Sequence, residues 1–190
     1  MNSKFTFLAI VLFSISSFGQ YKYDSGHGFK FITKSENYLK TGNLDKAKKY
    51  IKKARKSDFQ GGNPEATAKS RINLIEAQIL IRQKLYDEAL TLLDTTHGAS
   101  FGVNCPERDS LKIAALFSKY GKEKVKASFK NIQVIKRPDI DQFDTDYCAF
   151  NKELNYNFCF YTDYEILNDE KTKINFQELA KDQIFYKLLE

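Results

Sequence analysis

Residues 29–56 read FKFITKSENYLKTGNLDKAKKYIKKARK, and this segment sets the expected architecture of the N-terminal half. Its apolar residues recur three and four positions apart, which is the spacing of one face of an α-helix. The pattern is interrupted at 41–43, where Gly42 suits the left-handed position after a helix and Asn43 suits the N-cap of the next helix. The segment therefore predicts two helices joined by a short turn. The apolar positions are Phe31, Tyr38, Leu39, Leu44, Ala47, Ile51 and Ala54.

A second pair of helices is expected directly after this segment. The sequence Asn63-Pro64-Glu65 is typical of a helix start, because proline fits the first turn and an acidic residue is favoured at the positive end of the helix dipole. The apolar spacing predicts a helix from Pro64 to about Gln83. A further amphipathic helix opens at Leu85 and continues through Leu93.

A third helix pair is expected over 106–135. The stretch 106–119, PERDSLKIAALFSK, is amphipathic, and Gly121 ends it. In the following stretch, 122–135, Val125 and Phe129 fall at helical spacing, but Val125, Ala127 and Phe129 also alternate as residues of a strand do. This stretch is therefore left open between helix and strand.

The first two helix pairs resemble tetratricopeptide repeats, which are pairs of antiparallel helices of about 34 residues that place small residues where the two helices touch. The string YDEALTLL at 86–93 is the best single match, and Lys84 stands where the repeat has a turn glycine. The resemblance implies a helical-repeat domain over 28–135. The matching residues are Phe31, Ser35, Tyr38, Gly42, Leu44, Ala47, Ile51 and Ala54 in the first repeat, and Ala77, Leu80, Tyr86, Ala89 and Leu93 in the second.

The resemblance also implies a function, because such repeats hold a peptide or a partner protein in a groove lined by the first helix of each pair. Three of the implied groove residues, Lys40, Arg71 and Arg82, are cations that would suit an acidic or C-terminal carboxylate ligand. The chain is on this basis expected to be a protein-interaction scaffold. The implied groove residues are Glu36, Leu39 and Lys40 in the first repeat, and Arg71, Leu74, Gln78, Ile81 and Arg82 in the second.

The C-terminal segment, 136–190, is acidic and rich in aromatic residues. Leu154, Tyr156, Phe158 and Phe160 alternate with polar residues, which predicts a half-buried strand, and a second strand is expected at 164–167 to complete a β-hairpin. A terminal helix is expected over 175–189, with Asn175 as its N-cap and a stripe of apolar residues. The predicted fold class is mainly α with a small α+β C-terminal part. The stripe consists of Phe176, Leu179, Ala180, Ile184 and Leu188.

The N-terminus, 1–19, has the three-part pattern of a secretory signal peptide. A lysine precedes an apolar run, and Ser17 and Gly19 stand at −3 and −1 of a cut before Gln20. The run is shorter than the roughly 20 residues of a membrane-spanning helix. We therefore expect an extracytoplasmic protein, periplasmic or secreted, that is soluble and has no transmembrane segment, with 20–27 as a flexible leader.

Three cysteines, Cys105, Cys148 and Cys159, follow the predicted signal peptide. An extracytoplasmic setting permits disulfides, and an odd number allows one bond and one free thiol or an intermolecular bond. The loop between Cys148 and Cys159 closes at the least entropic cost, so this pair is the favoured disulfide, although geometry can override that preference. The cysteines form no CxxC pair, which disfavours a metal site.

No catalytic or phosphate-binding motif stands out, so the sequence predicts no enzyme, no cofactor and no metal site. Hydrophobic residues make up 42% of the chain, which excludes intrinsic disorder. The net charge of +6 is unevenly distributed, because residues 20–130 sum to 22 − 12 = +10 and residues 131–190 to 7 − 12 = −5. The acidic segment could therefore dock on the basic one.

Two other functions stay open at this point. The segment 46–56 is dense in cations and could bind an anionic cell-surface polymer or lipid headgroups, whereas genomic nucleic acid is disfavoured by export. An enzyme with a site assembled from scattered residues is the second alternative. The cations of the segment are Lys46, Lys48, Lys49, Lys52, Lys53, Arg55 and Lys56.

Overall fold

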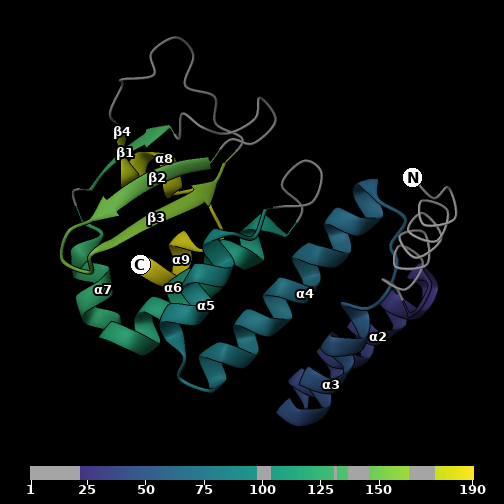
Figure 1. Cartoon of the computed structure of the whole chain (residues 1–190). Helices are drawn as coiled ribbons and strands as arrows, with labels where there is room; N and C mark the ends of the chain where they lie inside the picture. The colour runs from purple at the N-terminus through teal and green to yellow at the C-terminus, as the bar shows by residue number, and fades with distance from the viewer. Residues whose placement is uncertain (1–21, 98–103, 131, 137–145, 163–173) are drawn as a thin grey trace, which may run out of the picture. The chain divides into compact units, whose positions relative to one another are not determined.

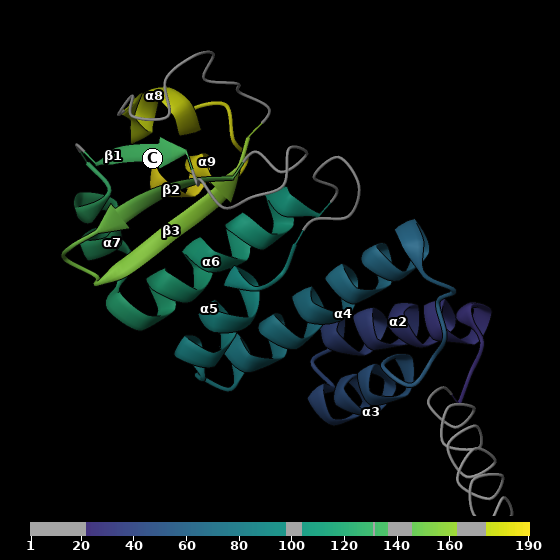
Figure 2. The ribbon, with the colours of Figure 1, turned by 45° about the horizontal axis from the view of Figure 1, so that its top comes forward.

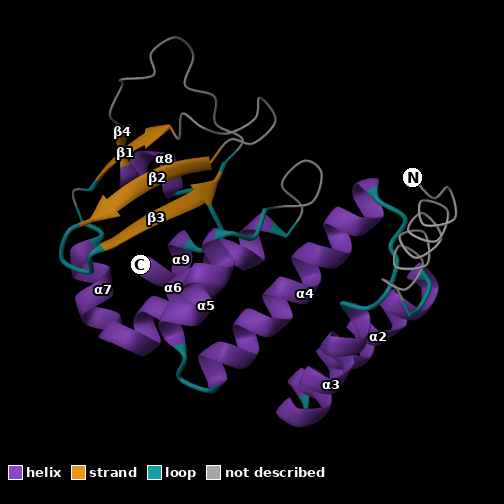
Figure 3. Cartoon of the chain, viewed as in Figure 1, coloured by secondary structure: helices purple, strands orange, loops and turns teal. Residues whose placement is uncertain are grey.

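A computed structural model of the chain describes residues 22–97, 104–130, 132–136, 146–162 and 174–190 (Figure 1). The predicted signal peptide lies outside these residues. The chain divides into two compact units, one up to residue 68 and one from residue 69 onward. It is mainly helical, with a small antiparallel sheet near the C-terminal end (Figure 3). None of the described helices combines the length and the apolar character needed to cross a membrane.

The first unit is built on a helical hairpin, α2 (Ser25–Lys40) and α3 (Leu44–Ala54), whose helices lie side by side (Figure 2). The turn between them is as predicted. Gly42 has a φ of 77°, and the Asn43 side chain accepts a hydrogen bond of 3.1 Å from the Lys46 backbone N–H. Because a residue with a Cβ is strained at such a φ, glycine is the natural choice at this position.

The hairpin begins earlier than the sequence predicts. Asp24 caps α2 by accepting a 2.9 Å hydrogen bond from the His27 N–H. The segment before it lies along the end of α3, where the Lys22 N–H donates to the Lys56 carbonyl at 2.7 Å and the Asp58 N–H donates to the Tyr23 carbonyl at 2.8 Å. The predicted flexible leader, 20–27, is therefore wrong over its second half.

Small residues let the two helices of the hairpin approach closely. Ser35 is fully buried on α2 and donates a 2.8 Å hydrogen bond from Oγ to the Ala47 carbonyl on α3. Gly28 lies against Phe59, and a Cβ on Gly28 would come within 2.6 Å of that ring. These contacts fix where α2 packs.

Helix α4 (Gly62–Arg82) leads into the second unit, where α5 (Tyr86–Asp94), α6 (Cys105–Tyr120) and α7 (Lys122–Ser128) follow. Helix α4 starts two residues before the predicted Pro64. At the turn after α4, Lys84 takes a φ of 64°, so a lysine occupies the left-handed position at which the repeat pattern has glycine. The sequence leaves 122–135 open between helix and strand. The structure has both, since the helix α7 is followed by the strand β1 (Gln133–Lys136).

Among the described residues, the sheet has four antiparallel strands in the order β3-β2-β1-β4. The predicted strand at 154–160 is present as β3 (Tyr156–Tyr161), but its hairpin partner is the preceding strand β2 (Asp146–Asn151). A tight turn joins β2 to β3, and Asn155 in this turn has a left-handed conformation. The turn brings β3 back alongside β2, the strand that precedes it in the sequence. The predicted partner at 164–167 lies outside the described residues, and β4 (Ile174–Asn175) adds a short edge.

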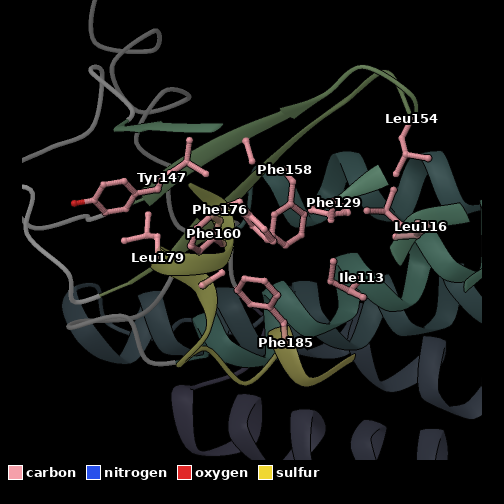
Figure 4. Packing of buried hydrophobic residues seen from close by; sticks show 14 of the residues in the cluster. Ile113, Leu116, Phe129, Tyr147, Leu154, Phe158, Phe160, Phe176, Leu179 and Phe185 are labelled. Carbon is pink, nitrogen blue, oxygen red and sulfur yellow. The ribbon is translucent and has the colours of Figure 1, made fainter. Parts of the chain in front are cut away.

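One face of the sheet packs on an aromatic core (Figure 4). Phe158 and Phe160 are fully buried, as their predicted alternation requires, with ring centroids 5.8 Å apart. On the opposite face Cys148 and Cys159, which are register partners, form a disulfide, and Cys105 is a buried free cysteine. The other large members of this core are Ile113, Leu116, Phe129, Tyr147, Leu154, Phe176, Leu179 and Phe185.

The predicted terminal helix is divided into α8 (Phe176–Ala180) and α9 (Tyr186–Leu189). Asn175 caps α8, as predicted, by accepting from the Gln177 N–H at 2.8 Å. The break rotates the following residues, so that Phe185 enters the core at 1% exposure while Ile184 is 63% exposed. The predicted apolar stripe is therefore wrong in its second half. Phe185 is buried in place of Ile184, because the burial of an aromatic ring stabilises the core more.

Candidate anion-binding surface

The exposed side of α3 carries a continuous set of lysines. Ala47, Ile51 and Ala54 form the buried face of the helix. At 3.6 residues per turn, the lysines fall on the remaining circumference, where each is exposed or half-buried. They are Lys46, Lys48, Lys49, Lys52 and Lys53 on α3, and Lys56 follows just after its end.

A hollow of about 570 Å³ lies between this helix and the segment that precedes α2. The segment is held there by the parallel bridge between Tyr23 and Ser57, which brings Lys22 to the same opening. Asp45 is the one carboxylate among the residues that line the hollow. The lining residues are Lys22, Tyr23, Asp45, Lys48, Lys49, Lys52, Lys53 and Lys56.

The lysines on and just after α3 have no acidic partners among the described residues. Within the described part of the chain, no Asp or Glu forms an ion pair with any of these six lysines. An ordinary solvated helix intersperses acidic residues at i, i+4 to its lysines, which relieves repulsion. On α3 only Asp45 stands at or near this spacing, before Lys48 and Lys49, and it forms no ion pair within the described residues, so much of the repulsion between the ammonium groups is left in place.

Aromatic rings hold several of the lysines instead of carboxylates. Phe31 and Tyr38 on α2 flank Tyr50 on α3, with centroid distances to Tyr50 of 6.1 and 5.5 Å. The Nζ of Lys53 lies 5.4 Å from the centroid of Phe31, and that of Lys46 lies 5.2 Å from Tyr38. A cation–π contact restrains an ammonium group and leaves its net charge in place. The hairpin thus presents partly ordered positive charge.

The predicted groove residues are divided between the two units, with Glu36, Leu39 and Lys40 in the first and the other five in the second. Leu39 is 3% exposed and Leu74 is 2% exposed, the latter in a cluster with Ala77 and Leu93, so neither offers surface to a partner.

The other predicted groove residues are engaged in contacts or lie wholly or partly at the surface. The Gln78 Nε2 donates to Glu107 Oε1 at 3.1 Å, and Ile81 packs against the aromatic core. Lys40 and Arg82 are exposed, and Glu36 and Arg71 are half-buried. Leu74 and Ile81, which the repeat resemblance implies to be groove residues, take part in internal packing.

The second unit contains a buried cluster of charges on α6. The Arg108 Nε donates to Asp109 Oδ1 at 2.7 Å, with both side chains no more than 4% exposed. One turn on, the Lys112 Nζ lies 2.8 Å from Asp94 Oδ1, and the Tyr156 hydroxyl donates to the same oxygen at 2.8 Å. The cluster holds two cations and two anions, so its charges cancel.

This cluster closes the free edge of the sheet. The Tyr161 N–H donates to Asp109 Oδ2 at 3.0 Å, and the Lys112 Nζ donates to the Cys159 carbonyl at 2.8 Å. These are the positions at which β3, an edge strand, would otherwise present unpaired backbone groups. The side chains of α6 thereby take the place of another strand.

Burial raises the pKa of two groups of the cluster, Asp109 and Tyr156. Desolvation raises the pKa of the Asp109 carboxyl, and the neighbouring Arg108 opposes that shift. Desolvation, followed by the charge of Asp94, raises the pKa of the Tyr156 hydroxyl. In the described part of the chain every buried side-chain nitrogen and oxygen has a hydrogen-bond partner. The α6 cluster is therefore satisfied internally, and the α3 surface is the better candidate for a ligand.

The chain matches no family model, no curated protein and no solved structure. Its function is therefore inferred from the contacts of its own residues.

Proposed function

We propose that this protein is an exported, non-enzymatic binding module that holds an anionic polymer of the cell surface on the α3 face of its N-terminal hairpin. The observation that carries the proposal is the set of five lysines on α3, with Lys56 just after it, that have no acidic partner in the described residues. All of them except Lys46 line one hollow. Binding a polyanion would relieve the repulsion that the fold leaves in place.

An extended polymer fits this surface because the cations follow a helix of 11 residues and continue past its end to Lys56. At 1.5 Å per residue, α3 offers a track of roughly 16 Å. Several anionic groups of one chain can contact such a track together. Each contact adds little alone, but together they release several counterions, and that release dominates the affinity of lysine-rich surfaces for polyanions.

The experiment is equilibrium binding of the full secreted chain to heparin and to anionic lipid vesicles, compared with a variant that carries Lys49→Gln, Lys52→Gln and Lys56→Gln. We expect the variant to lose heparin affinity. A matched control replaces the exposed Lys122, Lys181 and Lys187 of the second unit with Gln, which conserves the change in net charge. Equal loss in both variants, or binding to vesicles in preference to heparin, would contradict the proposal.

A peptide or partner protein is the second candidate. The small-residue contact between Ser35 and Ala47 supports a hairpin of the tetratricopeptide type, and such hairpins are peptide-binding scaffolds. Affinity capture with Lys40→Glu, Arg71→Glu and Arg82→Glu as the variant tests it. A protein partner lost in this variant and retained in the α3 variant would favour this second candidate.

A further inference from the structure

We infer that the hollow between Lys22–Tyr23 and α3 is a subsite for a group that carries two or more clustered phosphates. The inference rests on the proposed function, since it names the anionic group that the α3 face would take. It starts from the convergence of lysines from two separate segments on one opening.

The charge around the hollow is denser than a polymer with widely spaced single charges requires. Lys49, Lys52 and Lys53 on α3 line the opening together with Lys56 beyond its end and Lys22 from the preceding segment. The backbone hydrogen bonds between Lys22 and Lys56 and between Tyr23 and Asp58 hold this segment beside the end of α3. Six lysines and one carboxylate line the hollow, which gives 6 − 1 = +5. A phosphomonoester carries about −1.5 to −2 at neutral pH, so this excess charge can take two or more clustered phosphates.

The type of cation favours phosphate over carboxylate. All the cations that line the hollow are lysines, while Arg55, the single arginine of the segment 46–56, does not line it. Lysine recognises an anion as a point charge, whereas the planar guanidinium of arginine matches a carboxylate in a bidentate fashion. A site made of lysines therefore favours a ligand with a high density of negative charge, such as clustered phosphates, over a single carboxylate.

The one acidic residue that lines the hollow, Asp45, indicates which end of the hollow an anion would occupy. Asp45 lies on the first turn of α3, so it repels an anion at that end. The phosphates are therefore expected at the opposite end, between Lys22, Lys53 and Lys56. The volume of about 570 Å³ is within the usual range for small-ligand sites, and it accommodates a compact group on a longer chain.

The experiment is competition against labelled heparin bound to the full chain, with tripolyphosphate and citrate as competitors at equal ionic strength. We expect tripolyphosphate to displace heparin at a concentration about tenfold lower than citrate does. A variant with Lys22→Gln, Lys53→Gln and Lys56→Gln should lose this preference. A variant with Lys34→Gln and Lys46→Gln, which lie outside the hollow, should keep it, and thermal melting should show that both are folded.

Two further arms separate the sources of the phosphate and the possible failures. Tighter binding of long-chain polyphosphate than of tripolyphosphate, at equal phosphate concentration, would assign the group to a polymer, and equal binding would assign it to a free ligand; both support the subsite. Heparin binding with equal competition by citrate would overturn the subsite and leave the proposed function standing. An absence of heparin binding would overturn both.

Discussion

Helices α3 and α6 use the same kind of residue in opposite ways. Lys53 on α3 is half-buried, has no acidic partner in the described residues and touches the rings of Phe31 and Tyr50. Lys112 on α6 is 1% exposed and contacts Asp94 and the carbonyl of Cys159. The ammonium group of Lys53 is accessible to a ligand, whereas that of Lys112 is engaged in an ion pair and a hydrogen bond inside the fold. Net charge alone does not distinguish them, whereas the partners of each lysine do.

The largest effect is expected for Asp109→Ala in the α6 cluster. The change removes the carboxylate that pairs with the buried Arg108 and an acceptor of the Tyr161 N–H. Breaking a buried pair on one side costs about 3–5 kcal/mol of the free energy of unfolding. Urea unfolding measures this loss. The control is Asp87→Ala, because Asp87 is 78% exposed in its pair with Lys119. A loss below about 1 kcal/mol would show that the cluster does not stabilise the fold.

A smaller loss is expected for Lys112→Met. The Cys159 carbonyl loses its donor, but Asp94 is 35% exposed, so water and the Tyr156 hydroxyl can still satisfy it. An unsatisfied buried group costs about 1–3 kcal/mol. The corresponding change on α3, Lys53→Met, should leave the free energy of unfolding nearly unchanged. Equal losses in the two variants would remove the distinction between the two helices.

How much of this the sequence predicted differs between the two helices. The helical hairpin follows from the local signals at Gly42 and Asn43, and the lysines of α3 were visible as a run. The sequence does not predict that the rings of Phe31, Tyr38 and Tyr50 contact the lysines, because nothing distinguishes these residues from other aromatic positions of an amphipathic helix. Their contacts to lysines depend on how α2 packs on α3.

The α6 cluster was not predicted, although a signal for it exists. Arg108, Asp109 and Lys112 fall on the same side of the helix as the buried Ile113 and Leu116, where apolar residues are expected. The other members, Asp94 at the end of α5 and Tyr156 on β3, join the cluster only when that helix and the sheet pack against α6. The division of the terminal helix was missed for the same reason, since Phe185 is selected by the shape of the core.

A modest effect is expected for Ser35→Ala in the hairpin. The change removes the hydrogen bond from Ser35 to the Ala47 carbonyl, which is worth about 1 kcal/mol at a buried site. The exposed Ser118 makes the same kind of bond to the Ala114 carbonyl, so Ser118→Ala is the matched control and should cost less. Chemical denaturation followed by circular dichroism compares them. An identical cost would mean that the bond between α2 and α3 contributes nothing beyond a local one.

The smallest effect on stability is expected for the lysine variant of α3. Replacing Lys49, Lys52 and Lys56 with Gln removes no carboxylate contact in the described residues, so the free energy of unfolding should change by no more than about 0.5 kcal/mol. Thermal or urea unfolding measures it. A large destabilisation would place these lysines among the structural charges, as at α6.

The most direct test of the claim that α3 holds an anionic partner is the salt dependence of heparin binding. We expect the logarithm of the binding constant to fall steeply with the logarithm of salt concentration, and the slope to shrink by about two to three in the Lys49, Lys52 and Lys56 variant, since each lysine lost releases fewer counterions. The variant with Lys122, Lys181 and Lys187 changed to Gln should keep the original slope. The same slope and affinity in all three proteins would contradict the account.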